Sequence, residues 1–342
     1  MKEYRWNITE SAPKEYVIQI IEGHFESEDG YLNGIPTRAL VHKGWGEGRS
    51  NIASGREEMP LPKRFEVLWF SWREDKFYQG NFELPLEKIT EFVELDRRTP
   101  YSLYEHASST FTLGLAPGGF VVIWLHSGIH NWEVFRGQAE EVEGVPWNEV
   151  FNNPEFTKEE VVAEVIEESL EEVPNSPQLN DPDYWKRLHE EVYEYDILIE
   201  SEYMSYVIKA VFNNDERHTY YSDAQNWKSA PLSMLEAISI DYFFPDETRM
   251  ADLENINTDQ MYDAFRTLRK ESDSPLRVVV SIDGSLLGWK FTTRLRVEND
   301  ERSIEITDYK FGRYGGKEDI DDVLESKELM RYMNYPGKPA QP

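Results

Sequence analysis

The apolar pattern of residues 63–72 is the feature that most constrains the fold of this chain. Phe65, Val67 and Trp69 lie on one face of this segment and more polar residues on the other. A repeat of two residues is typical of a strand with one buried face. Most of residues 1–145 carry patterns of this kind, separated by turn residues.

A hairpin is expected over residues 111–125, because Pro117 and Gly118 supply the turn geometry between two apolar runs. Further strands are expected at residues 16–25, 77–84 and 132–137, and Pro85 is expected to open a short helix at residues 86–95.

The pattern changes to helical spacing after Pro154. Thr157 and Glu160 have the spacing of a capping box. The apolar residues that follow recur at helical intervals until Pro174. A second helix is expected at about residues 184–195, after a connector that contains proline and asparagine.

The last 140 residues alternate strands and helices, with Thr258 expected to cap a helix that runs to Lys270. Strands are expected at residues 202–212, 236–244, 275–282, 289–297 and 303–311, and a final helix at about 318–332. The sequence therefore predicts an α+β protein. It is expected to comprise a strand-rich region 1–150 with an antiparallel sheet, an acidic helical segment 151–200 and an α+β domain 201–342.

The charge and the cysteine content of the chain limit the partners and the kinds of site that it can have. It has 342 residues, 65 acidic and 36 basic, with a net charge of −29. Bare nucleic acid is an unfavourable partner, because phosphate contacts need clustered lysine and arginine. The absence of cysteine excludes disulfides, Cys–zinc sites, iron–sulfur clusters and thiol catalysis. Acidic residues concentrate in residues 151–200, with 15 acidic and 3 basic side chains.

No segment has the composition of a membrane span or a signal peptide. The longest apolar runs, such as residues 120–125, are far shorter than the ~20 residues of a membrane helix. Residues 1–10 are polar. A complete chain of this kind is expected in the cytoplasm, and in the periplasm if a leader was removed.

The sequence contains no complete motif for binding a cofactor. Gly44, Gly46 and Gly48 lie in a glycine-rich loop, but Arg49 stands where a dinucleotide loop needs its third glycine. A serine-hydrolase elbow is also missing. His126 and His130 are four residues apart in a strand context, where they would not share a helical face. We therefore expect neither a metal site nor an organic cofactor.

Two features suggest a protein partner, and each has a simpler alternative. The glutamate-rich face of residues 157–172 is either a solvated helix face or a docking surface for a partner with a basic surface. Trp45, in the glycine-rich loop, is either a plug on the core or a binding anchor. The candidate partner-binding residues are Glu160, Glu164, Glu167, Glu171 and Trp45.

Several motifs together resemble the DUF2931 family of uncharacterised bacterial proteins. They are Ser11-Ala12-Pro13-Lys14-Glu15-Tyr16, Gly44-Trp45-Gly46, Leu61-Pro62, Trp69-Phe70-Ser71-Trp72, Lys76-Phe77-Tyr78, Leu84-Pro85, Gly114-Leu115-Ala116-Pro117-Gly118-Gly119 and Trp124-Leu125. Residues 238–244 and 275–282 also resemble the longer members.

The resemblance implies no catalytic residue set. Members of the family are often encoded near type VI secretion genes and lipase-like effectors, so the resemblance implies an immunity or accessory role. Many members also resemble lipoproteins. The leading hypothesis is a non-enzymatic immunity protein that occludes an effector. The alternatives are a hydrolase that uses carboxylates with His126 or His130, and a structural accessory of the secretion machinery.

Overall fold

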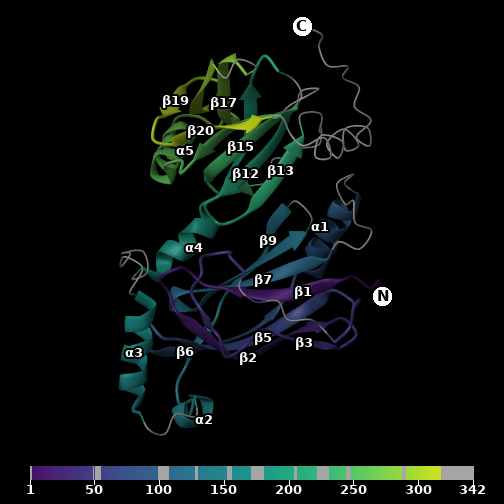
Figure 1. The fold of residues 1–342 in the computed structure, drawn as a ribbon, viewed down its shortest axis with the longest axis vertical. Helices are drawn as coiled ribbons and strands as arrows, with labels where there is room; N and C mark the ends of the chain where they lie inside the picture. Colours follow the sequence, from purple (N-terminus) through teal and green to yellow (C-terminus); the bar gives the residue numbers. More distant parts are fainter. Residues whose placement is uncertain are drawn as a thin grey trace. The chain divides into compact units, whose positions relative to one another are not determined.

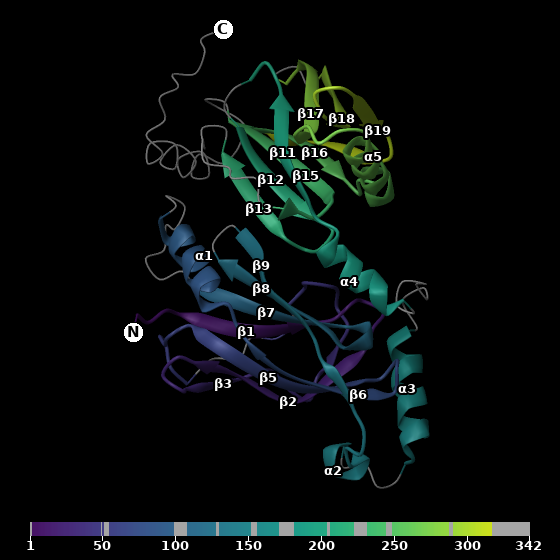
Figure 2. The same ribbon diagram turned by 180° about the vertical axis from the view of Figure 1, so that it is seen from behind.

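The computed structural model divides the chain into two compact units, residues 1–188 and 189–342 (Figure 1). We call them unit 1 and unit 2, and Figure 2 shows the same ribbon from behind. The residues that the structure describes are 2–48, 50, 55–98, 108–127, 130–151, 156–170, 181–203, 206–221, 231–243, 248–286 and 290–316.

Two β-sheets face each other in the described part of unit 1 (Figure 1). The first has the order β1-β7-β8-β9, in which β1 and β7 are parallel and the other neighbours antiparallel. Its strands are β1 (Trp6–Ser11), β7 (Ser109–Ala116), β8 (Phe120–Ser127) and β9 (His130–Gln138). A 3-10 turn at Pro117–Gly119 joins β7 to β8 and makes the expected hairpin.

The second sheet of unit 1 is antiparallel and has the order β10-β6-β5-β2-β3, with β4 also paired to β2. Its strands are β2 (Ile18–Ser27), β3 (Leu32–Gly34), β4 (Leu40–Val41), β5 (Pro62–Ser71), β6 (Lys76–Glu83) and β10 (Glu140–Val142). The alternating face of β5 is buried between the sheets, as its period predicted. Phe65 stacks on Phe25 there, with ring centroids 5.2 Å apart.

Four helices of unit 1 lie outside these sheets in the part of the chain that the structure describes. They are α1 (Leu86–Arg98), α2 (Trp147–Phe151), α3 (Lys158–Leu170) and α4 (Pro182–Glu190), the last of which crosses the boundary between the units. Helix α1 contacts β8 and β9 and buries Ile89 and Val93. Helices α2 and α3 cover Phe70, Trp72 and Phe77 on the outer face of the second sheet.

Unit 2 also holds two sheets in its described residues. One has the order β13-β12-β15-β16-β20 and the other β14-β11-β17-β18-β19, in which β11 and β17 are parallel. The strands are β11 (Tyr193–Glu200), β12 (Tyr206–Phe212), β13 (Arg217–Tyr221), β14 (Pro231–Leu232), β15 (Leu235–Phe243), β16 (Thr248–Glu254), β17 (Leu276–Ser285), β18 (Lys290–Glu298), β19 (Ser303–Ile306) and β20 (Lys310–Gly316).

Helix α5 (Thr258–Glu271) fills the core of unit 2. It contacts β15 of one sheet and β17, β18 and β19 of the other, and its Met261, Phe265 and Leu268 are fully buried. From the sequence, Thr258 was expected to be the N-cap of this helix, but the N-cap is Asn257. Asn257 has an extended backbone, and its side chain accepts a hydrogen bond from the Gln260 amide at 3.0 Å.

The α+β class is confirmed, and several elements begin or end at other residues than expected; the strand expected from residue 202, for example, is β12, which begins at Tyr206. The helix expected to reach residue 195 ends at Glu190, because Tyr195 and Ile197 are buried on one face of β11 and pair with β17. The single strand expected at residues 303–311 is two strands, β19 and β20. The helix expected at residues 318–332 lies outside the described residues.

Candidate functional site

Helix α3 carries an acidic surface. Its Val161, Val162, Val165 and Ile166 pack on the outer face of the second sheet of unit 1. The helix therefore turns the carboxylates of the remaining positions outward, and these are exposed. We call Glu159, Glu164, Glu167 and Glu168 the α3 glutamates.

Glu160 has a different role from the α3 glutamates, because its carboxylate closes the predicted capping box. It accepts hydrogen bonds from the Thr157 amide at 2.9 Å and from the Thr157 hydroxyl at 3.0 Å, and the Glu160 amide donates to that hydroxyl at 3.3 Å. These bonds lower the pKa of Glu160. Glu171, another candidate partner-binding residue, lies outside the described residues.

The α3 glutamates have no hydrogen bond or ion pair in the described part of the chain. The one basic residue of the helix, Lys158, is already paired with Asp75 at 2.6 Å, and its ammonium lies over the ring of Phe70. Glu164 and Glu168 are one helical turn apart, and like charges at that spacing disfavour a helix by about 0.2–0.5 kcal/mol per pair. A cation from outside the described residues would relieve this repulsion.

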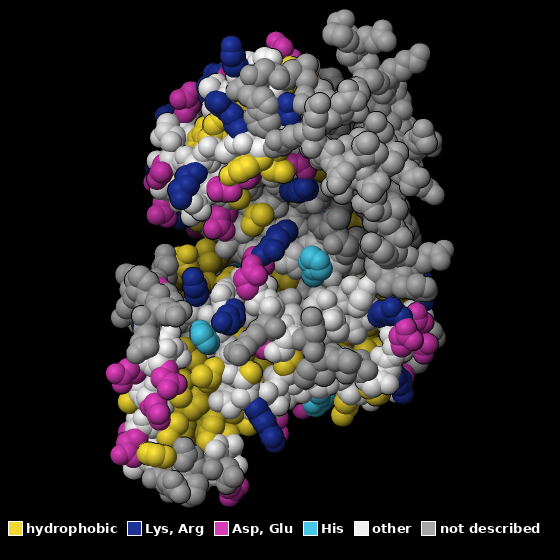
Figure 3. Space-filling model, viewed as in Figure 1, with side chains coloured by type: hydrophobic (Ala, Val, Ile, Leu, Met, Phe, Trp, Pro, Cys, Tyr) yellow, Lys and Arg dark blue, Asp and Glu magenta, His cyan; other side chains and the backbone are white. Residues whose placement is uncertain are grey.

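An apolar strip borders the acidic helix. Figure 3 shows acidic side chains along α3 and a yellow area beside them. Half-buried residues of the neighbouring strands and of α2 and α3 make up this strip, and Phe156, just before α3, is 52% exposed. A charged rim next to an apolar surface is the arrangement found at many protein interfaces.

Trp45 is half-buried in an aromatic cluster on the outer face of β7 and β8. Its ring lies edge-on to Trp124, with centroids 4.9 Å apart, and 5.2 Å from Trp185 of α4. Gly114 makes this packing possible, since an added Cβ would lie 2.4 Å from a ring carbon of Trp124. Trp45 therefore packs against this outer cluster of its own unit, and its use as an anchor for a partner stays a prediction.

The carboxylate of Glu74 joins three of the motif segments. It accepts hydrogen bonds from the phenol of Tyr16, from the phenol of Tyr78 at 3.2 Å and from the amide of Gly118 at 3.0 Å. Gly118 has φ = +72°, a conformation that favours glycine. We call this group the Glu74 cluster.

The Glu74 cluster is suited to hold segments together. Burial, and then the charge of Glu74, raises the pKa of Tyr16 well above its ordinary value. Burial and the charge of Glu74 also raise the pKa of Tyr78. Both phenols therefore stay protonated at neutral pH and act as hydrogen-bond donors, not as bases. The sequence did not single out Glu74, although it lies between the motif segments 69–72 and 76–78.

His126 and His130 lie on the neighbouring strands β8 and β9. Burial, together with the nearby His126, lowers the pKa of His130 to about 4. The His130 ring stacks on Trp132 with centroids 4.6 Å apart. Within the described ranges, no group of three or more His, Cys, Asp or Glu side chains is placed to hold a metal ion. No helix in those ranges is long and apolar enough to span a bilayer.

Comparison with known proteins identifies the family. The model of the DUF2931 family, described as a protein of unknown function, matches residues 1–177. The chain belongs to this family. No curated protein and no solved structure matches the chain.

Proposed function

We propose that this DUF2931 member is a non-enzymatic binding protein, and most concretely an immunity protein that occludes a type VI secretion effector of the lipase-like kind. The observation that carries the proposal is the row of α3 glutamates, which is exposed and has no ion pair within the described residues. A basic effector surface would supply the missing cations.

The electrostatic effect is expected mainly in the rate of association. Charges at the rim of an interface steer the approach of a partner, whereas affinity depends on buried aromatic and apolar contacts. In this proposal the apolar strip beside α3 supplies such contacts, and Trp45 is the further candidate anchor. The alternative is that the α3 face only keeps the protein in solution.

The test uses the effector encoded by the neighbouring gene, co-expressed with and without this chain while growth is scored. The α3 variant changes Glu159, Glu164, Glu167 and Glu168 to Gln, which preserves helix propensity. It leaves Glu160 in place, so that the capping box is intact. We expect its association rate with the effector at low salt to fall by about tenfold or more. That difference should shrink as the Debye length approaches about 8 Å.

The matched control removes four exposed carboxylates elsewhere: Glu3, Glu58, Glu194 and Glu202, all changed to Gln. Both variants lose the same net charge. Equal association rates for the two variants would show that the α3 face does not meet the partner. The hydrolase alternative predicts that His126→Gln or His130→Gln abolishes protection in a chain that still binds the effector.

A further inference from the structure

Unit 2 repeats the strand topology of unit 1. Adding ten to the strand labels converts the orders β1-β7-β8-β9 and β10-β6-β5-β2-β3 of unit 1 into β11-β17-β18-β19 and β20-β16-β15-β12-β13, the orders found in unit 2. The parallel pair corresponds as well, since β1 with β7 becomes β11 with β17. Helix α1 lies between β6 and β7 in the chain, and α5 lies between β16 and β17. The two-residue strands β4 and β14 differ, because β4 pairs with β2 and β14 with β11.

A buried aromatic side chain makes the same hydrogen bond in both units. Trp6 forms the first pair of β1 with β7, and Tyr195 forms the first pair of β11 with β17. The Trp6 indole donates to the Pro60 carbonyl oxygen at 3.1 Å, and the Tyr195 phenol donates to the Ser233 carbonyl oxygen at 2.7 Å. Pro60 lies two residues before β5, and Ser233 two residues before β15. These bonds therefore align Pro60 with Ser233.

The same alignment places core residues on core residues. The fifth, seventh and ninth residues after Pro60 and Ser233 are buried in both units: Phe65, Val67 and Trp69 in β5, and Ile238, Ile240 and Tyr242 in β15. The third, fifth and seventh residues of β7 and β17 are buried as well: Phe111, Leu113 and Leu115, and Val278, Val280 and Ile282. A slip of one residue would turn such side chains to the other face, so the two units share their register.

The turn that follows β2 recurs after β12. Ser27 and Phe212 end these strands, and each carbonyl accepts a hydrogen bond at 2.9 Å from the amide three residues later, which belongs to Gly30 or Asp215. Both donors have a positive φ, +82° for Gly30 and +65° for Asp215. The pairing of β2 with β5 and of β12 with β15 aligns the same residues. Because residues other than glycine rarely adopt this conformation, its recurrence at Asp215 is a specific point of likeness.

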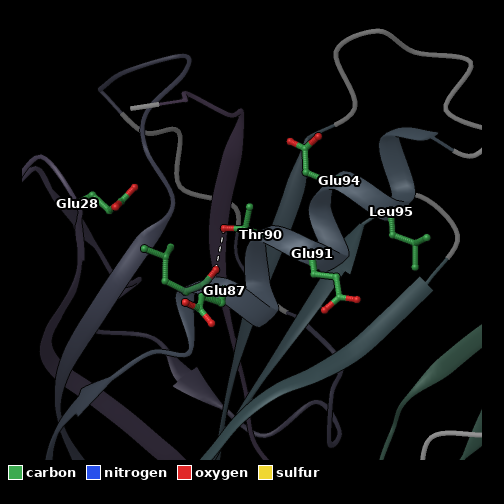
Figure 4. Close-up of a pocket in the computed structure, with 7 residues that line it drawn as sticks. Glu28, Glu87, Thr90, Glu91, Glu94 and Leu95 are labelled. Carbon is green, nitrogen blue, oxygen red and sulfur yellow. Dashed lines mark hydrogen bonds between the residues drawn. The ribbon is translucent and has the colours of Figure 1, made fainter.

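Helices α1 and α5 correspond in their buried and in their exposed positions. The fourth and eighth residues of each helix are buried: Ile89 and Val93 in α1, and Met261 and Phe265 in α5. The second and sixth residues of each helix are exposed and acidic: Glu87 and Glu91 in α1, and Asp259 and Asp263 in α5. Figure 4 shows Glu87 and Glu91 at the open acidic groove beside α1.

We infer that unit 2 is a second copy of the DUF2931 fold and that the chain is a tandem of two such domains. The family model matches residues 1–177 and so covers the first copy only. Unrelated sandwiches share an architecture, but a sandwich does not require the same aromatic anchor, register and left-handed turn residue at corresponding positions. Equivalent residues such as Trp6 and Tyr195 differ in type, and this divergence hides the repeat in the sequence.

The two copies differ on the outer face of the sheet that holds the parallel pair. Trp124 and Arg296 are equivalent, because each lies opposite the fourth residue of β7 or of β17. Trp124 packs on Trp45, whereas the Arg296 guanidinium binds the Glu200 carboxylate at 2.6 Å. An aromatic cluster in unit 1 thus corresponds to an ion-paired surface in unit 2. Any contact that uses the Trp45 cluster is therefore specific to the first copy.

A crystal structure of the full chain tests the correspondence. Unit 2 is superposed on unit 1 with Pro60 aligned to Ser233. We expect equivalent Cα atoms of the shared strands to lie closer together, on average, than the ~3.3 Å rise of one strand residue. The matched control shifts unit 2 by two residues, which keeps the buried faces but should displace the strands by about 6.6 Å. An equal fit for the shifted alignment, or a different strand order in unit 2, would overturn the inference.

Common ancestry of the two units has a separate test in the sequences of longer relatives. Relatives that contain both units are aligned over each unit separately, and the two alignments are then compared without structural input. We expect the best pairing to place Pro60 on Ser233 and Phe65 on Ile238. A best pairing at another register, or a closer match of unit 2 to a different family, would mean that two unrelated domains converged on one topology and would overturn the duplication.

Discussion

The phenol of Tyr16 donates a hydrogen bond to the carboxylate of Glu74, 58 residues further along the chain. Tyr78 and the amide of Gly118 donate to the same carboxylate. The segments that distinguish the family by their sequence thus meet at one half-buried acceptor. This relationship makes the Glu74 cluster a testable support of unit 1.

Tyr16→Phe should destabilise unit 1 by about 1.5–3 kcal/mol, because a hydrogen bond to a charged acceptor is lost in the interior. Urea unfolding followed by tryptophan fluorescence reports on this unit, since eight of the ten tryptophans lie in residues 1–188. Tyr31→Phe, at a half-exposed tyrosine, is the matched control and should change the midpoint little. A Tyr16 variant as stable as that control would contradict a supporting role for the cluster.

The unmodified protein should lose stability in alkaline solution. The folded-state pKa of Tyr16 lies above its unfolded value of about 10. The unfolded chain therefore releases the proton first, and the stabilisation present below about pH 10 is lost as pH rises further. The urea midpoint should fall more steeply above this pH for the unmodified chain than for Tyr16→Phe. Parallel curves would show that Tyr16 is not coupled to folding.

Thr157→Ala should loosen α3 by about 1 kcal/mol, because two bonds of the capping box are lost. Glu160→Gln should be milder, since glutamine can also accept the hydrogen bond from the Thr157 amide. Hydrogen exchange of the amides in residues 158–170 measures both effects locally. Equal protection from hydrogen exchange in the unmodified chain and in both variants would mean that α3 is stabilised by the packing of its apolar face alone.

Asp252→Asn should stabilise unit 2 at neutral pH. Burial, and then the neighbouring carboxylates Glu254 and Asp241, raises the pKa of Asp252 to about 6. Its folded-state pKa lies above the unfolded value, so its stabilisation is full below about pH 4 and is lost as pH rises through about 6. The side chain is partly exposed, which screens the effect to about 1 kcal/mol.

Thermal unfolding followed by circular dichroism at about pH 4 and about pH 8 measures the difference. Asp196→Asn, at an exposed position on β11, is the matched control. The increase in thermal stability caused by Asp252→Asn should appear at the higher pH only. A gain of the same size at both values would point to a cause other than ionisation of Asp252.

Local patterns were sufficient for much of the fold. The alternation in residues 63–72 predicted β5 and its buried face, and the spacing of Thr157 and Glu160 predicted the N-terminus of α3. Both features depend on residues within one strand or one helical turn. The family resemblance also came from the sequence, and the family match over residues 1–177 confirms it.

Features that depend on distant pairing were not predictable in this way. No strand was predicted at β1, because residues 1–10 are polar. This segment is a strand because it pairs in parallel with β7, about one hundred residues later. Glu74 is one of 65 acidic residues, and only the fold brings Tyr16, Tyr78 and Gly118 to it.

The sequence by itself determined the strand and helix periods, the capping box and the acidity of α3, because these follow from side chains close together in the chain. Only the tertiary structure decided that Trp45 packs on Trp124 and that an acidic groove lies beside α1. Burial and charge pairing depend on which distant surfaces meet, and that is a property of the folded chain.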